Sequence, residues 1–242
     1  MPITCIERVI VAVNDLDAAC ARWSNAGFAF ADNRTRALDC DVASLHAGAV
    51  IIDLYEIRES RHNQVWKAAL QRGGGIIGWV WGTDDAEQDD LATFLPGVVT
   101  SSVVVRGDLT TRRAKLDQHR GANENTVDYL EHIVVMTPSL EDAIAAHEKI
   151  GLPCKRIREA GGGMRQAFFK LEQTVLEIVG PARGEPQVWG LAFMCKDIRH
   201  AVDLARANGL QATEPKVAIQ GGKIARIFDP LDGVAIAYME PA

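Results

Sequence analysis

The sequence predicts an α+β protein built from repeated units, each with the order strand, helix and three further strands (β-α-β-β-β). The main observation is an internal repeat. IERVIVAVNDLDAACARWSNAGF and the later VIIDLYEI recur as LEHIVVMTPSLEDAIAAHEKIGL and TVLEIVGP. A repeat of about 50 residues has the length of one supersecondary unit. In this alignment Arg8 falls opposite His132, and Asp53 falls opposite Glu177.

The first unit is expected over residues 4–57. Its first segment, ERVIVAV, is apolar and β-branched, and the next, LDAACARWSN, has apolar residues at helical spacing. Asp15 precedes this helix as a capping residue, and Gly27 follows its last turn. Short apolar runs separated by turn residues then lead to the strand-like VIIDLYEI.

The second unit is predicted to be truncated. GIIGWVWGTDD has the pattern of a strand and a helix start, EQDDLATFLPG that of a short helix, and only VVTSSVVVRGD remains as clear strand. Residues 110–128 are polar with little periodicity, which is typical of a connection. We therefore expect an N-terminal domain over residues 1–109, a linker over 110–128 and a C-terminal domain over 129–242.

The third and fourth units have clearer signals. EHIVVM predicts a strand, Ser139 starts a helix that Gly151 ends, and KRIRE, MRQAFFKL and TVLEIVG predict three strands. In the fourth unit GLAFMC precedes the helix IRHAVDLARANG, which Gly209 closes. The strands KVAIQGG, KIARIFD and GVAIAYME follow.

Composition limits the function classes. With 48% hydrophobic residues among 242, the chain can bury a sizeable core. A net charge of −6 argues against a nucleic-acid partner. We expect no signal peptide and no membrane span, and therefore a cytoplasmic protein. Five cysteines without CxxC spacing indicate reduced thiols. The partners expected are a small-molecule substrate and at most a second copy of the chain.

The four units, the helix starts VNDLDAA and TPSLEDA, and the terminal DPLDG turn before a strand resemble the vicinal oxygen chelate superfamily. This is the fold of glyoxalase I, extradiol dioxygenases, fosfomycin resistance proteins and bleomycin-binding proteins. The resemblance implies that units pair into open, cup-like barrels whose concave face holds the ligand, with two cups in this chain. WKAALQRGGGIIGWVW also resembles a glyoxalase-like subgroup.

The resemblance also implies metal ligands on the first and last strands of a unit. The third unit keeps both, as His132 and Glu177. The corresponding positions in the other units are Arg8 and Asp53 in the first, Ile77 in the second, and Leu191 and Ala237 in the fourth. Only half of a metal site is therefore expected, with one divalent ion of Mn, Fe, Ni or Zn as its candidate occupant.

Strand alternation places His132 on one face with Leu130 and Val134, and Glu131 on the other face. A buried histidine and a buried carboxylate on apolar strands need partners. Three interpretations stay open for His132 and Glu177. They form a hydrogen-bonded pair without an ion, a metal site completed by another residue, or a metal-free acid/base pair.

Four further residues are candidates for substrate binding. Arg8 is expected either to pair with Asp53 or to bind a substrate carboxylate. Arg165 and Arg226 fall on strands that line or edge the second cup, and Tyr238 is expected in the core or pocket wall. The histidines at positions 147 and 200 are expected on solvated helix faces.

These residues predict a glyoxalase-like enzyme, a lyase or isomerase that acts on a small oxygenated, aromatic or non-aromatic metabolite. His132 is its expected base or metal ligand and Glu177 the partner of His132. One alternative is an extradiol-type ring-cleaving dioxygenase. The other is a non-catalytic protein that binds a small ligand or confers resistance.

Overall fold

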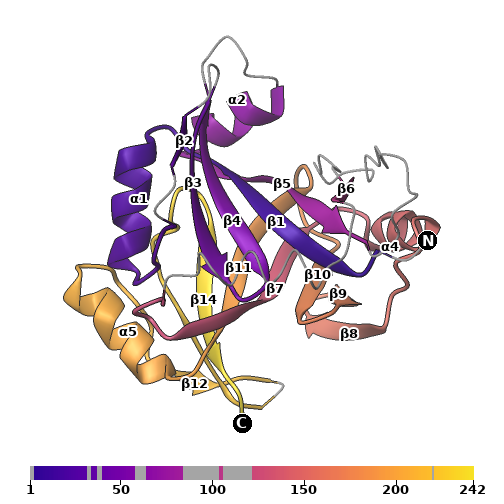
Figure 1. The fold of residues 1–242 in the computed structure, drawn as a ribbon. Coiled ribbons are helices and arrows are strands. Elements are labelled where there is room, and N and C mark those ends of the chain that lie inside the picture. The colour runs from indigo at the N-terminus through magenta and orange to yellow at the C-terminus, as the bar shows by residue number, and fades with distance from the viewer. Residues whose placement is uncertain are drawn as a thin grey trace.

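The computed structural model describes residues 3–31, 34–36, 40–57, 64–83, 104–105, 122–219 and 221–242. The short helix predicted in EQDDLATFLPG, and most of the predicted linker, lie outside these residues. Within them the chain forms two curled sheets and four helices, which confirms the predicted α+β class (Figure 1).

The N-terminal sheet has six strands in the order β2-β3-β4-β1-β5-β6. The first strand, β1, is parallel to β4 and antiparallel to β5. The strand bounds are Cys5–Ala12 for β1, Thr35–Arg36 for β2, Cys40–Ala47 for β3, Val50–Ile57 for β4, Gly75–Gly82 for β5 and Val104–Val105 for β6. In the described residues the second unit thus supplies only β5 and the two-residue β6.

The C-terminal sheet has eight strands in the order β12-β13-β14-β11-β7-β10-β9-β8. Its first strand, β7, is parallel to β10 and antiparallel to β11, which repeats the pairing of β1 with β4 and β5. The bounds are Val127–Met136 for β7, Arg156–Gly161 for β8, Met164–Leu171 for β9, Thr174–Gly180 for β10, Gln187–Cys195 for β11, Lys216–Val217 for β12, Lys223–Arg226 for β13 and Ala235–Glu240 for β14.

Three helices follow the first strand of their units and begin alike. They are α1 (Leu16–Asn25), α4 (Leu140–Lys149) and α5 (Ile198–Ala207). Each begins after a side chain that accepts a hydrogen bond from a backbone amide three residues on; these caps are Asp15, Ser139 and Asp197. Such caps satisfy amides that have no partner inside the helix. The repeat in sequence is therefore also a repeat of local structure.

The fourth helix, α2 (Gln64–Gln71), lies at one end of the molecule, apart from the others (Figure 1). It packs against Ile10, Ala12 and Ile77, on the face of the N-terminal sheet that points away from the main core. Tyr55 and Trp66 meet there with ring centroids 6.3 Å apart. This helix therefore covers the face that corresponds to the cup of the C-terminal sheet.

One hydrophobic core joins the two halves of the chain. Phe28 after α1 packs on Phe193 of β11, with ring centroids 4.9 Å apart. The buried hydroxyl of Tyr238 donates a 2.7 Å hydrogen bond to the carbonyl oxygen of Ala26. These contacts hold the first and fourth units together. Among the described helices, none has the length and apolar character needed to cross a membrane.

Candidate functional site

His132 lies on β7 next to a β-bulge, which changes the face that each neighbour occupies. The β7–β11 register shifts by one residue at Glu131. Leu130 and Ile133 consequently both face the main core, and each is fully buried there. Glu131 and His132 lie together on the other face, where both line one pocket. The prediction that His132 shares a face with Leu130 is therefore wrong, because simple alternation does not hold across a bulge.

The same irregularity recurs in the first strand of every unit. The registers shift at Glu7 in β1, Ile77 in β5, Glu131 in β7 and Trp189 in β11. The position equivalent to His132 is the residue after each bulge, so it is Arg8 in the first unit, Gly78 in the second and Gly190 in the fourth. Ile77 and Leu191, which the sequence placed there, are each displaced by one position.

The fourth unit offers no ligand to this site. Leu191 faces the main core. A Cβ atom on Gly190 would lie 2.4 Å from the carbonyl oxygen of Ala235, so no side chain fits there without movement of the backbone. Ala237, which pairs with Ala192 on β11, supplies only a methyl group. The chemistry of the cup therefore depends on the third unit.

His132 lies between two carboxylates. Its Nδ1 contacts a carboxylate oxygen of Glu131, and its Nε2 lies 3.9 Å from Oε2 of Glu177. The side chains of His132 and Glu177 are 7% and 14% exposed. Oε2 of Glu131 forms no hydrogen bond with the described residues, so this contact is electrostatic; a carboxylate beside Nδ1 favours the tautomer with its proton there and leaves the lone pair on Nε2.

Glu177 is held by a chain of hydrogen bonds across β10, β9 and β8. The guanidinium of Arg158 donates to Oε1 of Gln166 over 2.9 Å from Nε. This fixes the orientation of the amide, and Nε2 of Gln166 then donates to Oε1 of Glu177. Arg158 also lies over the ring of Phe168, 5.5 Å from its centroid. The other oxygen of Glu177 is left toward His132.

The pocket beside His132 has a volume of about 190 Å³. It is lined by Glu131, His132, Lys155, Arg156, Phe168, Lys170 and Val175. Burial lowers the pKa of His132 to about 4, and the charges of Lys170 and Arg158 act in the same direction. Burial also raises the pKa of Glu177, against the lowering effects of Arg158 and Gln166. At neutral pH the imidazole is therefore uncharged and has a free lone pair, although a pKa this far below 7 makes that lone pair only weakly basic.

The number of donor atoms decides whether the site can hold the metal ion that the resemblance implies. First-row divalent ions in enzymes are usually held by three or more protein ligands. Here His132 and Glu177 are two, and Gly190 and Ala237 add none. No group of three His, Cys, Asp or Glu side chains that could hold a metal ion occurs in the part of the chain that the structure describes. The described residues do not fit a three-ligand metal site.

In the N-terminal sheet, Arg8 and Asp53 form the ion pair expected from the alignment, at 2.6 Å. Asp53 is fully buried and also accepts a 2.6 Å hydrogen bond from Ser44. Both oxygens of Asp53 are thus in use, and α2 packs on the same face of the sheet. The geometry favours a structural pair here over a binding site for a substrate carboxylate.

The other predicted substrate-binding residues are dispersed. Arg165 pairs with Glu141 at the start of α4, on the helix-covered face, so it does not line the His132 pocket. Tyr238 is fully buried in the shared core, which corrects its assignment to substrate binding. Arg226 pairs in register with Ala237 and so lies on the concave face, at the far side of the cup.

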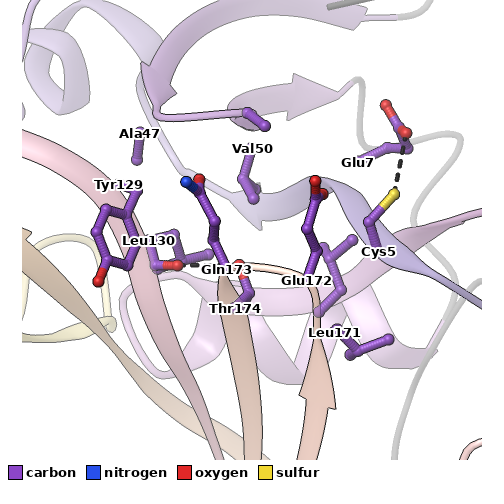
Figure 2. A pocket seen from close by; sticks show the side chains of 12 residues that line it. Cys5, Glu7, Ala47, Val50, Tyr129, Leu130, Leu171, Glu172, Gln173 and Thr174 are labelled. Atoms are coloured by element: carbon purple, nitrogen blue, oxygen red, sulfur yellow. Dashed lines mark hydrogen bonds between the residues drawn. The ribbon is translucent and has the colours of Figure 1, made fainter. Parts of the chain in front are cut away.

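Two other hollows lack this chemistry. The one in Figure 2 lies between the start of β1 and the β9–β10 turn, with Glu7 and Glu172 beside Cys5. Its volume of about 10 Å³ is at the lower limit for one water. Burial raises the pKa of the Cys5 thiol to about 12, so this thiol is unreactive. A wider hollow of about 670 Å³ beside α1 contains Asp17, which is paired with Arg34.

Sequence reasoning missed the residues that surround His132. Arg158 and Gln166 belong to predicted strands, and the sequence alone does not assign the positive charges at 155, 156 and 170 to a pocket. Strand pairing brings them together, because Val175 pairs with both His132 and Lys170, and Arg156 pairs with Phe168. The alternation of polar and apolar residues in MRQAFFKL was the available signal.

No family model matches the chain, and no curated protein matches it. Among solved structures, a mutant of 4-hydroxymandelate synthase from Streptomyces coelicolor superposes with a TM-score of 0.73 at 17% identity, over 100% of this chain and 93% of that one. A xylose isomerase-like TIM barrel/4-hydroxyphenylpyruvate dioxygenase fusion protein superposes with a TM-score of 0.67 at 12% identity, over 99% of this chain and 50% of the other. These identities support a shared fold and no more. The chain has the βαβββ fold of the vicinal oxygen chelate superfamily.

Proposed function

We propose that this protein is an isomerase or lyase that removes a proton next to a carbonyl group of a small oxygenated metabolite. The observation that supports this best is the position of His132, buried between Glu131 and Glu177 at a pocket of about 190 Å³. A histidine oriented by a carboxylate in a site with little water is an effective general base.

The proposed roles follow from the two ring nitrogens. Glu131 at Nδ1 holds the ring and its tautomer, so that Nε2 accepts the substrate proton. The imidazolium that forms is then stabilised by Glu177, 3.9 Å from Nε2. In an isomerase the proton returns to a neighbouring carbon, and in a lyase it goes to the leaving group. Either reaction needs the same first step.

Arg158 and Gln166 would act as positioning residues. They fix one oxygen of Glu177 through hydrogen bonds, so the second oxygen stays directed at His132. Phe168 lies against the ring of His132, with centroids 6.3 Å apart, and limits access of water to it. We expect these residues to affect the rate of proton transfer more than the affinity for substrate.

A dioxygenase is the alternative named by one of the structural neighbours. Iron sites that activate oxygen normally use two histidines and one carboxylate with open positions on the metal. The described residues place one histidine between two carboxylates, Glu131 and Glu177, and Gly190 has no space for a second histidine side chain. This donor set favours proton transfer over oxygen activation.

The test is exchange of substrate protons with solvent deuterium, followed by proton NMR with a panel of 2-oxo acids and 2-hydroxy ketones. The wild type should exchange at least one compound, and His132→Gln should lose at least 100-fold in rate, the usual size of a general-base contribution. His200→Gln is the matched control, because His200 is exposed and its ring hydrogen-bonds to the Glu124 carbonyl, away from the pocket. Equal exchange by His132→Gln and the wild type would disprove the role of His132.

Metal analysis separates the alternatives. Protein purified without chelators should contain no stoichiometric first-row metal at this site. The metal content of His132→Ala should therefore equal that of the wild type. Stoichiometric iron that disappears in this variant, together with oxygen consumption in the presence of a catechol, would establish the dioxygenase instead. Tight ligand binding without exchange or oxygen consumption would indicate the non-catalytic binding protein. The partners proposed are a small-molecule substrate and at most a second copy of the chain.

A further inference from the structure

We propose that Lys155, Arg156 and Lys170 form an anion-binding site at the pocket beside His132, which selects compounds that carry a carboxylate or phosphate group. The inference rests on the proposed function, because it names the class of substrate for the same pocket. None of these three residues was a candidate from the sequence.

The charge around this pocket is opposite to that of the protein. The chain carries a formal net charge of −6. Around His132, however, four cationic side chains accompany two carboxylates: Lys155, Arg156, Arg158 and Lys170 against Glu131 and Glu177. A positive cleft in an otherwise acidic surface attracts anionic ligands and raises their local concentration.

The three cations at the pocket form no salt bridge with the described residues, although Glu131 lines the same pocket. The side chains of Lys155 and Arg156 form no salt bridge or hydrogen bond with any residue that the structure describes, and Nζ of Lys170 donates only to the carbonyl oxygen of Gln173, at 3.2 Å. Some exposed basic groups elsewhere are paired, as Arg199 and Arg206 are with one carboxylate, Glu214. Charges left unpaired beside a cavity are available to a ligand.

Strand register places these charges at the right distance from the base. Lys170 pairs with Val175, which pairs with His132, so the three lie in one row across β9, β10 and β7. Adjacent strands are about 4.8 Å apart, so the Lys170 backbone is about 10 Å from that of His132. An anion between the two side chains would lie beside the ring of His132. The pocket, at about 190 Å³, is smaller than typical drug-sized sites of roughly 300–1,000 Å³ and suits a small acid.

The test is NMR titration of the isotope-labelled protein with pyruvate and, separately, with inorganic phosphate, at constant ionic strength set by sodium chloride. The amides of Glu131, His132 and Val175 should shift saturably with at least one of the two anions. The anion that binds more tightly identifies the head group as carboxylate or phosphate. Absence of saturable shifts with both anions would overturn the proposal.

Variants show whether the named charges are responsible. Lys170→Gln and Arg156→Gln should each weaken binding about tenfold, as expected for loss of one charge-assisted contact. Lys196→Gln removes an equal charge from a site 74% exposed and paired with Asp128, and it should change affinity less than twofold. Equal weakening by Lys170→Gln and Lys196→Gln would mean that only net charge matters, and would refute the site.

The anion site and the proposed chemistry can fail separately. His132→Gln should bind pyruvate within about threefold of the wild type, because the proposed anion contacts are made by other residues. Saturable binding without proton exchange in the wild type would reject the proposed function and leave the anion site intact. A proton-exchange rate that does not depend on Lys170 or Arg156 would reject the anion site and leave the proposed function intact.

Discussion

Lowering the pH should destabilise the fold through His147, a residue of α4 at the junction of the two halves. This histidine is fully buried, between Trp81 of β5 and Phe169 of β9, with ring centroids 6.5 and 4.8 Å away. Its Nδ1 lies 2.7 Å from the Ala143 carbonyl oxygen, and its Nε2 has no hydrogen-bond partner among the residues that the structure describes. Burial lowers its pKa from 6.5 to about 4. The folded state thus disfavours the imidazolium.

The direction and size of this pH effect on stability follow from the linkage between proton binding and folding. Because the pKa of His147 is lower in the folded state, its contribution is fully present above pH 6.5 and is lost as the pH falls toward 4. Between pH 7 and pH 4.5 the free energy of unfolding should fall by about 2 kcal/mol from this group alone, because each tenfold change in proton affinity between the two states corresponds to about 1.4 kcal/mol. His147→Leu should remove this loss and be as stable as the wild type at pH 7.

Urea denaturation at pH 7 and pH 4.5 measures both proteins. The wild type should lose about 2 kcal/mol more than His147→Leu over this interval. His200→Leu is the control, because His200 is exposed, and it should lose as much as the wild type. The same loss in His147→Leu and the wild type would refute the conclusion that the folded state excludes the charged form of His147.

Three further changes test the fold around the site by urea denaturation. Tyr238→Phe removes one of two buried donors to the Ala26 carbonyl, which keeps the bond from Nδ2 of Asn125, and should cost about 0.5–1.5 kcal/mol; no loss would mean that this bond does not join the halves. Ser139→Ala removes the cap of α4 and should cost about 1 kcal/mol, whereas an unchanged midpoint would contradict a capping role. Gly190→Ala places a methyl against the Ala235 carbonyl and should cost about 1–3 kcal/mol; a stable variant would show that a side chain does fit there.

Much of the fold could be predicted because the repeat contains its own boundary signals. Asp15 and Ser139 precede helices in both aligned copies, and each caps its helix in the structure. The pairing of Arg8 with Asp53 also follows from the alignment, because equivalent strands adopt the same register. Features that local sequence rules determine, such as helix caps, can be predicted where those rules agree with the overall fold.

The sequence could not predict which side chains of β7 face the pocket, because a β-bulge is a property of two paired strands. Glu131 has nothing in its local sequence that marks an extra residue, yet it moves His132 to the pocket face. A bulge in β11 likewise moves the position equivalent to His132 from Leu191, which the sequence predicted, to Gly190. His147 was expected on a solvated helix face and is buried, because the N-terminal half packs on α4. Contacts between segments that are distant in the sequence decide which of these side chains are buried.

The central claim is that an anionic substrate lies on Lys170 and Arg156 with its reacting atom at His132. A crystal structure with oxalate, a planar mimic of the enolate of a 2-oxo acid, tests it most directly. We predict one carboxylate of oxalate on Lys170 and Arg156, with the other within hydrogen-bond distance of Nε2 of His132. Oxalate coordinated to a metal ion held by His132 and Glu177, or bound outside this pocket, would contradict the account.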